Sequence, residues 1–222
     1  MPAMRSHSVI APALRRGLVV MVLLLGGVLA APAEDKDANA WFREGVQLFF
    51  AAKPAESLAA FDRVVALAPA NAPDLWQRGL VLYYAGKFAE GRTQFELHQT
   101  VNPNDVENAA WHFLCVAKAD GVEAARKALI PISGDARVPM AQVHALFAGT
   151  GSEEAVLKAT VDAGNQRDHL CYAHLYLGLY HEALGHADQA KDHLLKAATD
   201  FRMEHYMGRT AQVHVTLRGW GP

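Results

Sequence analysis

The feature that most constrains this chain is that its first third repeats itself. When the sequence is shifted by 34 positions, small residues, phenylalanines and prolines fall on one another. The matched pairs are Gly45/Gly79, Leu48/Leu82, Ala52/Gly86, Phe61/Phe95 and Pro69/Pro103. Two antiparallel helices with their two turns occupy about 34 residues, and such units bury their apolar faces by stacking on one another. The period therefore predicts an all-α repeat protein.

Three of these positions carry a resemblance to a known family. Gly79 lies in the middle of a first helix, Gly86 at the turn inside the hairpin, and Pro103 at the turn between hairpins. The chain resembles tetratricopeptide repeat proteins, whose repeats have a small residue, a glycine and a proline at these places. The physical reasons agree, because a small residue lets two helices approach, glycine closes a turn and proline ends a helix.

The pattern recurs near the C-terminus, where Gly178 and Gly185 are spaced as Gly79 and Gly86 are. Gly178 follows Gly79 by 99 residues, three fewer than three whole repeats, so the units between them are expected to be shortened. We expect a right-handed α-solenoid of about five helical hairpins with a C-terminal capping helix. The expected units are 39–71, 73–103, 104–131, 138–164 and 168–201, with the capping helix at 203–217. That last segment also alternates as a strand would.

Residues 1–33 have the features of a signal peptide. Three arginines in the first 16 residues precede the uncharged run Leu18–Leu29, and Ala31-Pro32-Ala33 has the small-x-small pattern of a cleavage site. We expect cleavage after Ala33 and export to the periplasm or an equivalent envelope compartment, or secretion. The alternative is an uncleaved membrane anchor, for which the apolar run is short.

In this family the first helix of each hairpin lines the concave face. Residues three and four apart on these helices form a stripe that is aromatic and almost uncharged. The expected partner-binding residues are Phe42, Phe49, Trp76, Tyr83, His112, Tyr172 and Tyr176. The family members that hold a C-terminal carboxylate do so with Lys and Asn at comparable positions, which this stripe lacks. The alternative is that these aromatic residues only pack between repeats.

The most distinctive polar segment is His98–His112. Its two histidines and nearby carboxylates are of the types that bind metals or transfer protons. The alternative is structural: Asn104 caps a helix, Glu107 completes a capping box, and His98 is a buried packing residue. The structural interpretation is the one that we favour.

Eleven histidines raise the question of a metal site. Two histidines on one helix must be three or four apart to share an ion, whereas His174 and His181, like His186 and His193, are seven apart. Seven residues rise about 10.5 Å along a helix, which is too far for one shared ion. We therefore predict no metal and no cofactor, although a site assembled between helices would leave no spacing signal.

The remaining composition narrows the function. Net charge is −2 and the 21 basic residues are scattered, so nucleic acid is not an expected partner. No phosphate-binding loop or nucleophile motif is present, so no catalytic residue and no enzyme activity are predicted. Cys115 matches the small-residue position of Gly79 and is expected to pack as a buried thiol, with a bridge to Cys171 as the alternative.

The leading functional hypothesis is an exported interaction scaffold that binds a peptide or protein partner in an aromatic concave groove. A structural subunit of an envelope complex is the second hypothesis. A metal-binding or enzymatic protein that uses His98–His112 is the third.

Overall fold

The computed structural model describes residues 36–221. The predicted signal peptide, residues 1–33, lies outside the described residues. Within the described range the regular structure is entirely helical, with eleven α-helices, one 3-10 helix and no strand. The all-α prediction is confirmed. None of the described helices is both long and apolar enough to cross a lipid bilayer.

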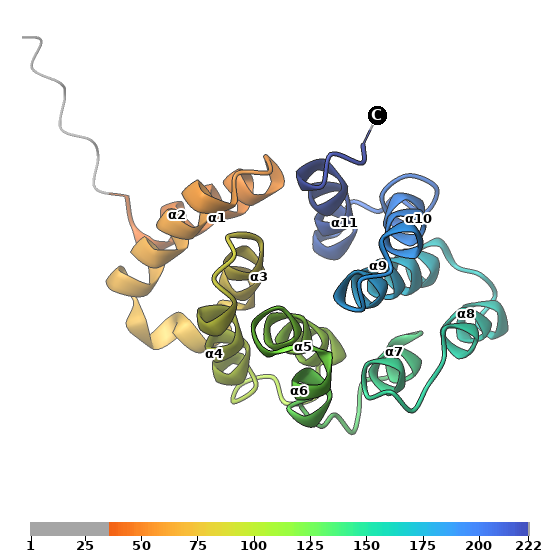
Figure 1. Ribbon diagram of the computed structural model, residues 1–222. Helices are drawn as coiled ribbons and strands as arrows, with labels where there is room; N and C mark the ends of the chain where they lie inside the picture. Colours follow the sequence, from red (N-terminus) through yellow and green to blue (C-terminus); the bar gives the residue numbers. More distant parts are fainter. Residues whose placement is uncertain (1–35, 222) are drawn as a thin grey trace, which may run out of the picture. The chain divides into compact units, whose positions relative to one another are not determined.

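The helices follow one another with mostly short connections, and the longest, residues 128–139, joins α6 to α7 (Figure 1). In chain order they are α1 (Ala38–Phe50), α2 (Pro54–Leu67), η1 (Pro69–Asp74), α3 (Trp76–Tyr84), α4 (Phe88–His98), α5 (Val106–Asp120), α6 (Val122–Lys127), α7 (Met140–Phe147), α8 (Glu153–Asp162), α9 (Arg167–Ala183), α10 (Ala187–Ala198) and α11 (Tyr206–Leu217).

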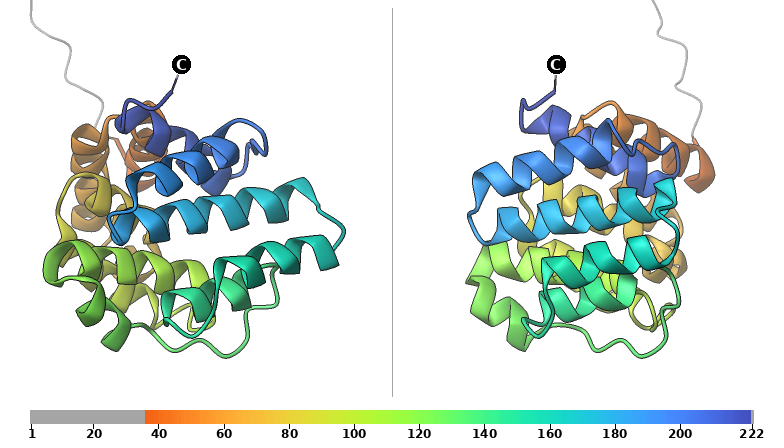
Figure 2. Two further views of the ribbon diagram at one scale, coloured as in Figure 1. Left: turned by 45° about the vertical axis from the view of Figure 1, so that its right-hand side comes forward. Right: turned by 90° about the vertical axis from the view of Figure 1, so that its right-hand side faces the viewer.

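Successive helices pack mostly in pairs: α1 with α2, α3 with α4, α5 with α6, α7 with α8, and α9 with α10. Figure 2 shows the pair α9–α10 lying alongside α7 and α8. Each of the five ranges expected as a unit covers one of these pairs, although α1 and α9 each begin one residue before the expected bound. Whether the pairs are five copies of one repeat stays a prediction.

Glycines on the first helices allow close approach inside three pairs. A Cβ placed on Gly79 would lie 2.6 Å from the Phe95 ring, and one on Gly178 would lie 2.5 Å from Leu194 Cγ. Gly45 faces the Phe61 ring in the same way. In each case the partner side chain comes 16 residues after the glycine. The recurrence of Gly45 and Gly79 in the sequence is thus explained by a helix–helix contact that any side chain would disturb.

The turns inside the hairpins use the left-handed backbone region. Gly86 and Gly185 follow the first helices of their pairs with φ of +75° and +79°. Ala52, which the sequence aligns with Gly86, takes φ of +56° despite its Cβ. The backbone conformation therefore favours glycine at these turns, although the first hairpin forms the same turn with an alanine, which rarely adopts it.

Polar caps fix the start of several helices, and one differs from expectation. The side chain that caps α5 belongs to Asp105, whose Oδ1 accepts from the Glu107 amide at 3.1 Å. Asn104, the predicted cap, instead accepts from Ser133 Oγ at 3.3 Å. Both residue types cap helices well, so the sequence alone does not choose between neighbours. The predicted capping box is wrong as well, because the Glu107 side chain contacts Arg137 and Tyr176.

The segment with an ambiguous period forms a helix, α11, which packs against both α10 and α1. Tyr206 at its start lies 4.7 Å from the Phe50 ring and 6.0 Å from the Phe49 ring, measured between centroids. In an open solenoid each repeat contacts only its neighbours. Here the last described helix also contacts the first, as Figure 1 shows.

A buried polar network holds α11 in this position. His214 is fully buried on α11, with Nδ1 3.0 Å from the Tyr84 hydroxyl and Nε2 2.8 Å from Glu182 Oε2. Arg218 donates to Glu182 at 2.6 Å. Burial alone would raise the pKa of Glu182, but His214 and Arg218 lower it to about 2. The carboxylate therefore stays ionised and joins α9 to α11.

We expect Gly79→Ala to lower the free energy of unfolding by about 1–3 kcal/mol, because the added methyl overlaps the Phe95 ring. Phe95→Leu removes that ring, so the double variant should lose less than the sum of the single losses. Urea denaturation of the four proteins measures the coupling. Losses that simply add would show that the ring contact is not the cause.

Candidate functional site

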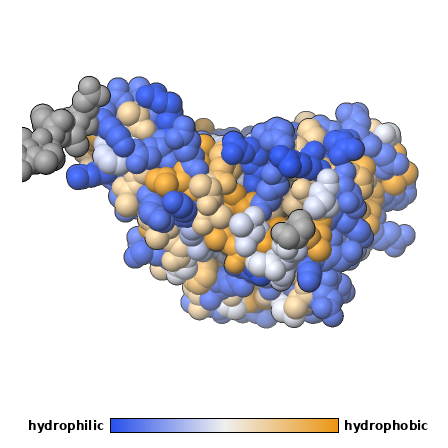
Figure 3. Space-filling view, turned by 90° about the horizontal axis from the view of Figure 1, so that it is seen from above, coloured by the Kyte–Doolittle hydropathy of each residue, from blue (hydrophilic) through white to orange (hydrophobic). Residues whose placement is uncertain are grey.

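A cavity of about 350 Å³ lies among α3, α5, α9 and the start of α11. Half of its twelve lining residues come from the first helices of three pairs, α3, α5 and α9. The lining residues are Trp76, Leu80, Phe95, Asp105, Glu107, Asn108, Trp111, Arg137, Tyr172, His205, Tyr206 and Met207. The face seen from above in Figure 3 has apolar side chains in its middle and polar ones along its margins.

Aromatic rings that brace one another form much of the wall. Trp76 packs edge-on against Tyr206, with ring centroids 4.7 Å apart. Tyr172 stacks on His205 at 5.0 Å with an interplanar angle of 10°. Trp111 packs edge-on against the buried Tyr83 at 5.3 Å. Such rings offer large contact areas with little freedom to lose, which is typical of binding surfaces.

One arginine gathers the acidic side chains at the other side of the cavity. Arg137, in the segment between α6 and α7, donates to Asp105 and to Asp135 at 2.6 Å each and contacts Glu107. Burial alone would raise the pKa of Asp135, but hydrogen bonds from Arg137 and the Val106 amide lower it. This cluster fastens the segment before α7 to the first turn of α5.

Glu107 lies between the charged and aromatic sides. Burial raises its pKa to about 7, although the Arg137 guanidinium opposes that rise. The Tyr176 hydroxyl donates to Glu107 Oε2 at 2.8 Å. A carboxyl group that titrates near neutral pH can accept a hydrogen bond when ionised and donate one when protonated.

Several residues around the cavity keep unused hydrogen-bonding capacity. Within residues 36–221, the buried side-chain atoms without a partner include Asn108 Oδ1, Trp111 Nε1, His205 Nε2 and the Tyr206 hydroxyl. His205 Nδ1 accepts from the Gly208 amide at 3.2 Å, so in the neutral ring Nε2 carries the proton. The set thus contains donors and an acceptor, which matches a ligand that has both, such as an amide.

The seven expected groove residues are distributed unevenly. Trp76 and Tyr172 line the cavity, and Tyr176 contacts it through Glu107. Phe49 and Tyr83 are buried, with Phe49 against Tyr206 and Tyr83 against Trp111. The remaining two, Phe42 and His112, pack against Phe61 and Glu96 respectively. A partner-binding role for these residues stays a prediction.

The histidines of the polar segment do not converge. His98 is buried, and its Nδ1 lies 2.8 Å from the Pro73 carbonyl oxygen, so the expected packing role is confirmed. His112 is also buried and lies 3.3 Å from Glu96 Oε1. Of His98, Glu107 and His112, only Glu107 lines the cavity. Both cysteines are free and buried, as expected for Cys115.

Sequence reasoning missed the residues that complete the cavity. Trp111 of α5 lines the cavity, whereas the prediction named its neighbour His112. Arg137 and the pair His205–Tyr206 lie outside regular hairpins, where the repeat gives no signal.

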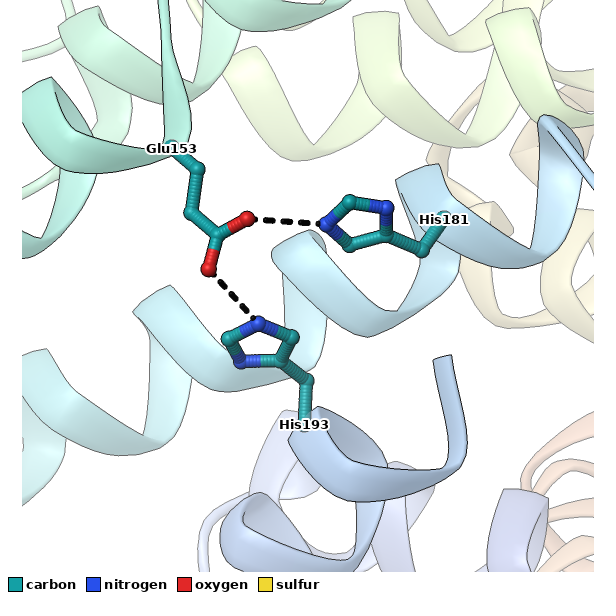
Figure 4. A group of neighbouring side chains, drawn as sticks. All are labelled: Glu153, His181 and His193. Carbon is teal, nitrogen blue, oxygen red and sulfur yellow. Dashed lines mark hydrogen bonds and ion pairs between the residues drawn. The ribbon is translucent and has the colours of Figure 1, made fainter. Parts of the chain in front are cut away.

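A second polar cluster brings together possible metal ligands. Among the described residues, the group with three such atoms close together is Glu153, His181 and His193, one each from α8, α9 and α10 (Figure 4). The histidine spacing within single helices indicated no shared ion, but His181 and His193 lie close together on two neighbouring helices.

No protein-family model matches the chain, and no curated protein matches it in sequence. The fold class therefore rests on the helices themselves.

We expect the pH dependence of stability to change in Glu107→Gln. A carboxyl whose folded pKa is raised from 4.5 to about 7 makes the protein less stable as pH rises through that window. Glutamine does not titrate. Between pH 5 and pH 8 the free energy of unfolding of the variant should therefore rise by about 2 kcal/mol relative to that of the wild type. Denaturant unfolding at both pH values measures this. A constant difference between the two proteins would contradict the raised pKa.

Proposed function

We propose that the protein is an exported binding module, a tetratricopeptide-like α-solenoid that holds a peptide or protein partner through the aromatic cavity. The observation that carries the proposal is the combination of rigid aromatic walls with unpaired donors and an acceptor on the lining residues. The recurring Gly45, Gly79 and Gly178 contacts support the solenoid assignment.

The size of the cavity defines how a partner is held. At about 350 Å³ it lies at the lower end of the range for ligand pockets, about 300–1,000 Å³. One bulky side chain with its adjoining peptide group fits that scale, so the rest of the partner lies outside. The amide N–H and C=O would then pair with Asn108 and with Trp111 or His205.

Charge around the cavity favours a particular partner segment. Arg137 is shared among Asp105, Glu107 and Asp135, so carboxylates outnumber the cation. Aromatic faces also attract cations. A segment with an aromatic or basic anchor residue is therefore favoured over an acidic one.

The test is selection of binders from a random peptide library on the mature protein, followed by titration of the selected peptides. Trp76→Ala should weaken binding about thirtyfold, or about 2 kcal/mol, because it removes a wall of the cavity. Trp41→Ala is the matched control, since Trp41 is also partly buried but lies beside Lys36 and not in the cavity.

Two outcomes would contradict this role for Trp76. Equal affinity of both variants would show that Trp76 is not an anchor. A loss of about 3–5 kcal/mol of stability in Trp76→Ala would mark it as a core residue instead. A protein that binds no peptide but assembles with other subunits would favour the structural alternative.

We further expect the exported protein to begin at Glu34, because Ala31-Pro32-Ala33 has the small residues that signal peptidase requires. N-terminal sequencing of the protein recovered outside the cytoplasm measures this. Ala33→Phe should leave the precursor uncleaved. A wild-type protein that starts at Met1 and stays with the membranes would support the anchor.

A further inference from the structure

Five side chains, four on helices α8, α9 and α10 and one in the turn between α9 and α10, form one continuous hydrogen-bonded cluster. Glu153, the first residue of α8, places Oε2 3.0 Å from His181 Nε2 and Oε1 2.9 Å from His193 Nε2. Figure 4 shows both imidazoles directed at the one carboxylate. The possible ligand atoms of these three residues all lie within 4.8 Å of one another.

We propose that Glu153, His181 and His193 bind one divalent transition-metal ion, with Zn²⁺ as the ion that fits best. Two imidazole nitrogens and one carboxylate oxygen are the donors of a three-ligand zinc site, in which water takes the fourth position. Metal–ligand bonds of about 2.0–2.2 Å place tetrahedral ligands about 3.3 Å apart, a spacing that small side-chain movements reach from here.

Two further histidines support the ligands from behind. His193 Nδ1 lies 2.8 Å from His174 Nδ1, and His181 Nδ1 lies 3.3 Å from His186 Nδ1. When a metal occupies Nε2, the proton of each ligand moves to Nδ1, which then donates to the neighbouring histidine. Such support of the far ring nitrogen is what metal-binding histidines require.

The positions of the side chains also suit an ion that enters from solvent. The side chains of His181 and His193 are 10% and 8% exposed, whereas that of Glu153 is 41% exposed.

The simpler alternative is a structural link in which Glu153 accepts two N–H donors. In that arrangement the two Nε2 atoms and the carboxylate oxygens have hydrogen-bond partners without an ion. Metal-binding measurements distinguish the two arrangements. The nitrogen donors predict a selectivity that a plain acidic patch lacks: Zn²⁺ and Co²⁺ bind, whereas Mg²⁺, which prefers oxygen ligands, does not.

The experiment uses the untagged mature protein after chelator treatment. Titration with Zn²⁺ should saturate at one ion per chain, Co²⁺ should give the absorption of a tetrahedral site, and Zn²⁺ should raise the melting temperature by several degrees. His181→Gln and His193→Gln should each weaken Zn²⁺ binding by at least a hundredfold, since each removes a ligand. Glu153→Gln, at the more exposed position, serves if a histidine variant fails to fold.

Glu96→Gln is the matched control, because Glu96 also contacts a buried histidine, His112, but has no second imidazole beside it. Its affinity for Zn²⁺ should equal that of the wild type. The proposal is overturned by any of three results: no saturable Zn²⁺ binding, binding that persists in Glu153→Gln and both histidine variants, or equal binding of Mg²⁺.

Discussion

The rest of the structure depends on how closely two helices of a pair can approach. A first helix and a second helix meet where a glycine leaves room for a phenylalanine ring or a leucine, as Gly79 does for Phe95. In the third pair the corresponding residue is Cys115, which is buried and faces Gly91 of α4. The small residue has moved to the neighbouring helix, so the close contact now joins two pairs. The cost of a larger side chain at either place is set by dense packing, because the surrounding atoms cannot move far.

The return of α11 to α1 turns an aromatic surface into a cavity. Tyr206 contacts Phe49, Phe50 and Trp76, which belong to the first helices of two pairs. The aromatic rings of α1 and α3 that face α11 are thereby covered in part. What stays accessible is the space beside Trp76 and Tyr172, bounded by the His205 ring. The packing of α11 against α1 and α3 thus stabilises the fold and also restricts the size of any ligand in the cavity.

The sequence predicted those features that local rules determine. Helices, hairpin turns at Gly86 and Gly185, and the packing role of His98 follow from period, backbone freedom and burial. It did not choose Asp105 over Asn104 as a cap, because neighbouring polar residues cap equally well. The sequence also did not show which residue covers Phe49. Apolar residues at a period of 3.6 identify the buried face of a helix, but not the residues that pack against that face. That partner, Tyr206, is distant in sequence.

The paired helices differ most in length around α6 and α7, and each candidate site takes one charged residue from this part of the chain or from the helix that follows it. Helix α6 has six residues and α7 has eight, whereas α5 has 15 and α9 has 17. Because α6 ends early, the segment that follows it carries Arg137 back to the start of α5 and into the cavity wall. Helix α8 then begins at Glu153 beside α9 and α10, opposite His181 and His193. Arg137 lies in a connecting segment and Glu153 at the start of a helix, where the periodicity of the helices does not predict which partners a side chain meets. Local sequence rules therefore fail at the two places where polar groups able to bind a ligand gather.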